Sequence, residues 1–282
     1  MERHGVLVVT CPDRPGIVAA IAGFLAERGA NIVEAQQHSE RSSGRFFFRV
    51  QFEPRGVPDE TLRREFAPIA ARFSMEWRLG FTDQPKRMAI FVSKYDHCLL
   101  DLLWRQRAGE IRAEVPIVIS NHPDLRSVVE GFGIRFEHVP ITPETKAEQE
   151  RRELELLAQC EVEFVVLARY MQVLSPVFLA GFPLRVINVH HGLLPSFPGA
   201  RPYSQARERG VKVIGATAHY ATEELDDGPI IDQDVVAVTH RDTVADLVRK
   251  GRDVERIVLA RAVRAHAEDR VFVDGRRTVV FA

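Results

Sequence analysis

Two neighbouring stretches decide the fold: RVINVHHGLLPSFPGARP at residues 185–202 and VIGATAHYATEELDDGPIIDQD at residues 213–234. Residues 186–190 form an apolar run that ends in polar side chains, which predicts a buried strand. Because successive strand residues alternate faces, Asn188 and His190 should point the same way. At the mouth of an α/β sheet, a carboxamide and an imidazole on one face can together hold a carbonyl oxygen.

The residues around this strand predict a loop, a second strand and a tight turn. The loop is indicated by residues that cannot continue a strand or a helix, namely Pro195, Pro198, Gly199 and Pro202. Residues 213–220 are apolar and predict the second strand. Gly228 and Pro229 then close a turn, so the acidic side chains just before them should lie on a loop tip. An Asn on a strand or an Asp-Asp-Gly-Pro turn is ordinary when it stands alone.

A metal site is the alternative interpretation of the His190-His191 pair. Neighbours on a strand face opposite ways, and no cysteine or H-E-x-x-H pattern accompanies them. We therefore predict no metal.

Taken together, the motifs N-x-H-x-G-x-L-P-x-F-x-G-x-x-P, G-A-T-x-H and L-D-x-G-P-I-I resemble the formyltetrahydrofolate-dependent formyltransferase and hydrolase family. In that family an Asn, a His and an Asp carry the chemistry, and they match Asn188, His190 and Asp226. Asp227 is the rival carboxylate, but the L-D-x-G-P pattern selects Asp226. The segment LARYMQVL at residues 167–174 matches the part of the family that holds the pterin ring. The substrate-binding residues that the resemblance implies are Arg169, Met171, Gln172 and Leu174, with Thr222 from the loop on the other side.

Composition places the chain among ordinary globular proteins. It has 282 residues, of which 45% are hydrophobic and 27% charged, enough for one large domain or two unequal ones. Lysine plus arginine total 38 against 39 acidic residues, so no basic excess indicates nucleic acid. No apolar run reaches the roughly 20 residues that span a bilayer, and no signal-peptide core follows the first residue. Three cysteines without a C-x-x-C pair suggest a reducing, cytoplasmic setting.

The first part of the chain predicts a small domain with the order β-α-β-β-α-β, a ferredoxin-like arrangement. We expect strands at 6–10, 32–39, 45–52 and 75–79 and helices at 17–29 and 58–73. The phrases D-R-P-G-I-V and G-A-N-I are similar to the ACT domain, a regulatory module that commonly binds amino acids and pairs side by side. The resemblance implies effector-binding residues Asp13, Gly16 and Asn31, a small amino acid such as glycine or methionine as effector, and a homo-oligomer. Alternatively, these residues only shape turns.

The second part predicts a doubly wound, mostly parallel sheet. The domains are expected at 1–82 and 88–282, joined by a polar linker at 83–87. We expect strands at 88–93, 115–120, 135–139, 164–168, 186–190 and 213–220, and helices starting near Asp96, Thr142 and Ser175. Two more helices are expected at 242–250, ended by Gly251, and at 253–266, with a hairpin at Asp274-Gly275. Ligands of such sheets bind beyond the carboxyl ends of the strands.

The first strand-to-helix turn of this domain distinguishes branches of the family. The related transferases have a glycine-rich turn there for a phosphorylated acceptor, whereas the turn at residues 93–98, S-K-Y-D-H-C, contains no glycine. Together with an ACT domain ahead of the catalytic domain, it resembles the hydrolytic, deformylase branch. That branch implies hydrolysis of 10-formyltetrahydrofolate to formate and tetrahydrofolate, with no cofactor, supplying formate for purine synthesis and balancing the folate pool. The alternatives are a formyltransferase acting on an amine and a regulatory protein without turnover.

Overall fold

The computed structural model describes residues 3–196 and 202–282 and divides into two compact units. The first unit contains the residues up to Pro85 together with 269–274 and 278–282. The second contains residues 86–268 and 275–277. The expected loop residues Pro198 and Gly199 lie outside the described part of the chain, and Pro202 starts a helix.

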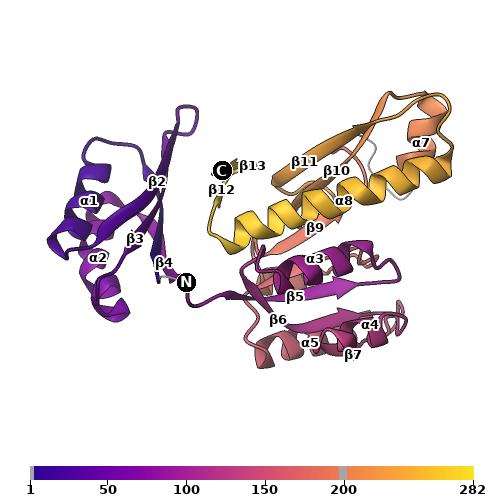
Figure 1. The fold of residues 1–282 in the computed structure, drawn as a ribbon, viewed down its shortest axis with the longest axis horizontal. Coiled ribbons are helices and arrows are strands. Elements are labelled where there is room, and N and C mark those ends of the chain that lie inside the picture. Colours follow the sequence, from indigo (N-terminus) through magenta and orange to yellow (C-terminus); the bar gives the residue numbers. More distant parts are fainter. Residues whose placement is uncertain (1–2, 197–201) are drawn as a thin grey trace. The chain divides into compact units, whose positions relative to one another are not determined.

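The first unit is a four-stranded antiparallel sheet with two helices (Figure 1). Its elements are β1 (Gly5–Pro12), α1 (Ile17–Glu27), β2 (Asn31–Glu40), β3 (Arg45–Glu53), α2 (Asp59–Phe73) and β4 (Glu76–Phe81), and the strand order is β2-β3-β1-β4. The side chains of Phe46, Phe48, Val50 and Phe52 share one face of β3 and pack in the core with α1 and α2. This is the expected β-α-β-β-α-β arrangement.

The opposite face of this sheet is covered by the end of the chain. Strands β12 (Val271–Asp274) and β13 (Arg277–Val280) form the expected hairpin, and Phe272 packs on Val6, Val8 and Phe47. The rings of Phe47 and Phe272 have their centroids 5.7 Å apart. All of β12 and residues 278–280 of β13 therefore belong to the first unit, although the sequence predicts that 88–282 all form the second domain. Alternating apolar residues predict a strand, but they do not show which sheet it will cover.

The second unit is built on a seven-stranded, mostly parallel sheet of order β11-β10-β9-β8-β5-β6-β7. Its strands are β5 (Lys86–Val92), β6 (Ala113–Ser120), β7 (Arg135–His138), β8 (Phe164–Leu167), β9 (Val186–His190), β10 (Val213–Tyr220) and β11 (Ile230–Ala237). Strands β5 to β9 run parallel, and β10 is antiparallel to both β9 and β11. Strand β11 is an edge strand in which buried and exposed residues alternate poorly, and it was not expected from the sequence.

Helices cover both faces of this sheet. They are α3 (His97–Arg107), α4 (Arg126–Gly131), α5 (Lys146–Gln159), α6 (Pro176–Gly181), α7 (Pro202–Arg209) and α8 (Val244–Ala267). Helix α6 begins as expected, because the Ser175 hydroxyl accepts a hydrogen bond from the Phe178 amide. Helix α8 crosses β9, β10 and β11 and packs against α3 (Figure 1).

The expectation of two helices separated at Gly251 was wrong, because α8 is continuous from Val244 to Ala267. Gly251 serves packing instead of ending a helix. A Cβ atom at this position would lie 1.9 Å from the hydroxyl oxygen of Tyr203, so only glycine lets that ring lie against the helix. Of the helices in the described part of the chain, none is long and apolar enough to cross a membrane.

Candidate active site

Asn188 and His190 lie near the carboxyl end of β9, and both line one cleft in the second unit. Strand β9 lies between β8 and β10, so its end is surrounded by backbone on both sides. His190 is buried and Asn188 is half-buried. The alternation of side chains along the strand therefore brings the carboxamide and the imidazole to the same place.

The loop after β10 brings Asp226 to these two residues. The Oδ2 atom of Asp226 lies 3.1 Å from Nδ1 of His190. Asp226 adopts a left-handed backbone conformation with φ of 57°. The loop closes tightly behind it, because a Cβ atom on Gly228 would lie 1.7 Å from the carbonyl oxygen of Tyr220. The glycine of the L-D-x-G-P motif is thus required by the close approach of two backbone segments.

The hydrogen bond from His190 lowers the pKa of Asp226, and burial only partly opposes this effect. Asp226 is therefore an anion at neutral pH, held against the imidazole ring. The other ring nitrogen of His190, Nε2, is buried and has no hydrogen-bond partner in the described part of the chain. A buried polar atom without a partner is costly, and in a cleft it marks the position where a bound molecule can supply one.

Asp227 points elsewhere. Its carboxylate forms an ion pair with Arg276, which belongs to the same unit, and both side chains are exposed. Asp227 does not line the cleft, whereas Asp226 does. The geometry thus agrees with the register that the L-D-x-G-P motif indicated.

His219 is a site residue that was not expected from the sequence. It lies on β10 opposite Asn188 of β9, and its Nε2 atom is 3.1 Å from Nδ2 of Asn188. Its Nδ1 atom is 3.0 Å from the carbonyl oxygen of Tyr220, which can only accept, so Nδ1 carries the proton. Burial lowers the pKa of His219. The ring is therefore neutral, and its Nε2 accepts a hydrogen bond from the Asn188 amide. The G-A-T-x-H motif contained this signal, but only pairing of β9 with β10 gives it a role.

The cleft has a volume of about 280 Å³ and is bounded by the segment after β8 and the loop after β10. All five predicted substrate-binding residues line it: Arg169, Met171, Gln172, Leu174 and Thr222. Two hydrogen bonds hold the segment after β8 in place. The Met171 amide donates to the Ser93 hydroxyl, which in turn donates to the side-chain oxygen of Asn121. A mainly apolar cleft with a few convergent polar groups is typical of small-molecule sites.

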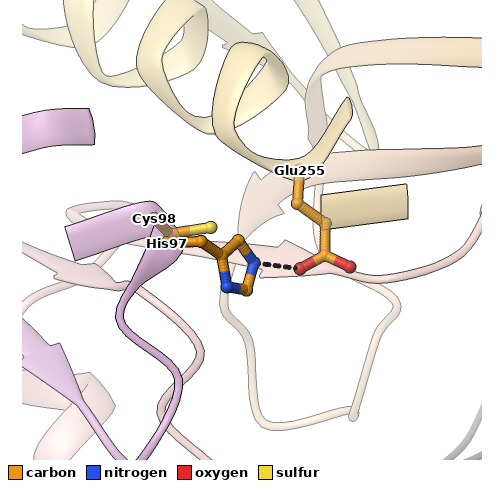
Figure 2. A group of neighbouring side chains, drawn as sticks. All are labelled: His97, Cys98 and Glu255. Atoms are coloured by element: carbon orange, nitrogen blue, oxygen red, sulfur yellow. Dashed lines mark hydrogen bonds and ion pairs between the residues drawn. The ribbon is translucent and has the colours of Figure 1, made fainter. Parts of the chain in front are cut away.

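A second histidine–carboxylate pair, His97 and Glu255 (Figure 2), lines a neighbouring cleft that shares Arg169 with the first. His97 at the start of α3 donates from Nε2 to Oε2 of Glu255 on α8, at 2.8 Å. The Tyr203 hydroxyl donates to Oε1 of Glu255 at 2.7 Å, and Nε of Arg169 lies 3.5 Å from Oε2. Burial alone would raise the pKa of Glu255, but the His97 hydrogen bond, the Arg169 charge and the Tyr203 hydroxyl together lower it. Glu255 is thus a buried anion surrounded by donors.

His97, Cys98 and Glu255 have donor atoms within 4.8 Å of one another, as a metal site requires (Figure 2). Their chemistry does not favour one. Burial raises the pKa of the Cys98 thiol well above its usual value, and Glu255 is already engaged by its three partners. The adjacent Arg169 guanidinium would also repel a cation. We interpret this cluster as a structural hydrogen-bond network.

The three predicted effector residues do not come together within this chain. Asp13 and Gly16 follow β1, which ends where Pro12 pairs with Arg45 of β3. Asn31 pairs with Glu53, at the other end of β3. Eight residues of strand separate these ends, about 26 Å at roughly 3.3 Å per residue.

Comparisons with known proteins agree with this architecture. Residues 5–64 match the ACT domain family, and residues 86–263 match the formyl transferase family. The fold and the Asn-His-Asp cleft thus define an ACT-containing protein of the formyl transferase class. The chain is 54% identical to a formyltetrahydrofolate deformylase of Synechocystis, over 98% of both chains. A crystal structure of a formyltetrahydrofolate deformylase from Pseudomonas syringae pv. tomato superposes with a TM-score of 0.98 at 49% identity, over 100% of this chain and 95% of that one.

A glycinamide ribonucleotide transformylase from Symbiobacterium toebii is more distant. It is 33% identical with a TM-score of 0.67, and the match covers 70% of this chain and 95% of the other. The similarity to deformylases therefore extends over the whole chain, whereas the similarity to this transferase does not. The chain belongs to the formyltetrahydrofolate deformylase family.

Proposed function

We propose that the protein hydrolyses 10-formyltetrahydrofolate to formate and tetrahydrofolate. This proposal rests on one observation: the chain is 54% identical to a formyltetrahydrofolate deformylase over 98% of its length, and its Asn188, His190 and Asp226 meet in one cleft. The apolar cleft between residues 169–174 and 222–226 would receive the pterin. The formate that the protein releases would supply purine synthesis, and the hydrolysis would balance the one-carbon folate pool.

Asn188 would stabilise the negative charge that grows on the formyl oxygen as water attacks. One N–H of its carboxamide is donated to His219, which fixes the orientation of the group and leaves the second N–H for the substrate. A preorganised donor of this kind typically contributes about 3 kcal/mol to a transition state. His219 would therefore act through Asn188, as a positioning residue.

His190 and Asp226 would handle the protons. Asp226 accepts from Nδ1 of His190, which holds the ring in place. The Nε2 atom, without a partner in residues 3–196 and 202–282, would stabilise the same developing charge and deliver a proton to the departing nitrogen. The carboxylate of Asp226 would orient the attacking water and remove its proton.

We propose further that this chemistry needs no metal and no organic cofactor, because side chains can supply each requirement: a donor to oxygen, a proton for nitrogen and a base for water. The protein would then turn over at the same rate before and after treatment with a chelator. A rate that falls with chelator and returns with one divalent cation would contradict this.

The decisive experiment is turnover without an acceptor. Purified protein given 10-formyltetrahydrofolate and no amine should release formate and tetrahydrofolate in equal amounts over many turnovers. Glycinamide ribonucleotide should neither accept the formyl group nor accelerate the reaction. If formate appeared only in traces while an added amine became formylated, the protein would be a transferase. Binding of folate without turnover would instead indicate a regulatory protein.

We infer that the ACT unit binds a small amino acid, glycine or methionine, in a homo-oligomer. Asp13 and Gly16 lie at one end of the sheet and Asn31 at the other, so a site using all three must combine two subunits. The exposed β2 edge with Ile32 and Val33 suits side-by-side pairing of two such units. The test adds glycine or methionine to the full chain and compares Asn31→Ala with Gln37→Ala, an exposed position on the same strand. Only the first substitution should abolish a change in rate, and an unaltered response in both variants would exclude Asn31.

We also place the protein in the cytoplasm. Cys11, Cys98 and Cys160 are all free thiols, which fits a reducing compartment. Fractionation of cells should recover the protein with the cytoplasmic enzymes.

A further inference from the structure

A second cleft, of about 190 Å³, adjoins the catalytic cleft, and Arg169 and His191 line both. Its remaining walls come from α3, α7 and α8 and the residues before α3, and include Tyr95, Tyr203 and Arg252. The proposed mechanism leaves this space unused. It is close to the reacting atoms, because His191 directly follows His190 in the chain and their rings have centroids 5.3 Å apart.

The charge of the second cleft favours an anion. Two guanidinium groups, of Arg169 and Arg252, each lie 5.4 Å from the centroid of the Tyr95 ring. Glu255 is the carboxylate that lines this cleft; its oxygens accept from His97 and Tyr203, and the Arg169 guanidinium lies 3.5 Å from Oε2 without a hydrogen bond to it. Arg252 is exposed and makes no ion pair with any residue in the described ranges. The cleft therefore offers two guanidinium groups against one carboxylate that is already hydrogen-bonded.

The walls of this cleft are held rigidly. The Tyr203 hydroxyl is fixed by Glu255, and the absence of a side chain at Gly251 lets the ring lie against α8. His97 is fixed by the same carboxylate. A preorganised wall loses little entropy when a ligand binds.

We propose that the second cleft receives the formate product, so that this anion leaves the active site by a route separate from tetrahydrofolate. This inference rests on the proposed function. The ligand class is a small monocarboxylate, whose two oxygens match the paired N–H groups of a guanidinium. Since a water molecule takes about 30 Å³, the cleft has room for formate with several waters. It would therefore act as a weak transit site.

Product inhibition tests the proposal. If formate and the folate occupy different clefts, formate inhibits noncompetitively against 10-formyltetrahydrofolate. Arg252→Gln should raise the inhibition constant for formate about fivefold, a modest factor because the side chain is exposed. The matched control is Arg249→Gln on the same helix, which is exposed, pairs with Asp246 and does not line the cleft. Sodium chloride at equal ionic strength controls for screening.

Purely competitive inhibition by formate, or equal inhibition constants in the wild type and both variants, would overturn the proposal. A direct binding measurement distinguishes failure of the formate site from failure of the proposed function. Line broadening of the ¹³C-formate NMR signal is measured with the protein bound to tetrahydrofolate, and it needs no turnover. Broadening that Arg252→Gln removes and Arg249→Gln retains supports the site even if no hydrolysis is found. Broadening that is absent in the wild type, in a protein that releases formate, leaves the function standing and rejects the site.

Discussion

The histidine–carboxylate pairs His97–Glu255 and His190–Asp226 of the second unit differ in what surrounds the carboxylate. Glu255 projects from a long helix and is engaged by His97, Tyr203 and Arg169. Asp226 projects from a loop tip beside a cleft, with His190 as its main partner. A buried carboxylate with a full set of donors stabilises structure, whereas one with a single donor and access to a cleft can act on a substrate. The pair alone does not distinguish the two cases.

The largest expected effect is on catalysis at Asp226. Asp226→Asn keeps the shape of the side chain and removes its charge, so turnover should fall by roughly 10² to 10³ while folate affinity changes little. Asp227→Asn is the control, because Asp227 pairs with Arg276 outside the cleft. Steady-state kinetics with 10-formyltetrahydrofolate measure both. If the losses were reversed, Asp227 would be the catalytic carboxylate.

A third buried carboxylate, Glu153, sharpens the comparison because it has few donors and no access to solvent. Burial raises its pKa to about 7; within residues 3–196 and 202–282 the Tyr170 hydroxyl bonds to Oε1 and Oε2 has no partner. As the pH rises from about 4.5 to 7, the unfolded chain loses this proton and the folded protein keeps it, so stability should fall across that window.

Glu153→Gln should remove this loss and retain the acceptor for Tyr170. Between pH 5 and pH 8, the difference in free energy of unfolding (variant minus wild type) should increase by about 3 kcal/mol. Urea denaturation at the two pH values measures the difference. Parallel pH profiles for the two proteins would show that Glu153 ionises normally in the folded state.

A substitution at Gly251 tests the structural role of the Glu255 hydrogen-bond network. Gly251→Ala places a methyl group against the Tyr203 hydroxyl, so the ring must shift and its bond to Glu255 must weaken. The cost should be about 2 kcal/mol of stability, as in other overpacked cores. Gly131→Ala in α4 is the control, since its Cβ would meet nothing within 4 Å. Thermal melting compares them, and equal melting temperatures would deny Gly251 a packing role.

The smallest expected effect concerns His219. His219→Leu removes the acceptor for the Asn188 amide, so turnover should fall about tenfold with little change in KM. His219→Gln offers a carbonyl acceptor in its place and should recover part of the loss. A variant in which KM rises and turnover is unchanged would make His219 a contact of the substrate and not a support for Asn188.

The sequence could predict the elements whose signals are local. Asn188 and His190 follow from strand alternation, and the β-α-β-β-α-β order of the first unit from its turns and apolar periods. Signals that depend on packing partners were missed. Gly251 looked like a helix end because nothing in the sequence shows that Tyr203 lies against it. His219 gained its role only when β10 paired with β9, and β11 lacked a clear alternation because it is an edge strand.

Because the C-terminal hairpin packs on the first unit, that unit cannot complete its fold until the end of the chain has been synthesised. The first 85 residues emerge from the ribosome with Val6, Val8 and Phe47 uncovered, because Phe272 is made only after residues 86–268 of the second unit. The apolar face of the nascent first unit therefore stays exposed until synthesis ends, and chaperones can bind it. A premature stop codon after residue 268 would leave that face bare permanently and favour aggregation, although every residue of the catalytic cleft would be present.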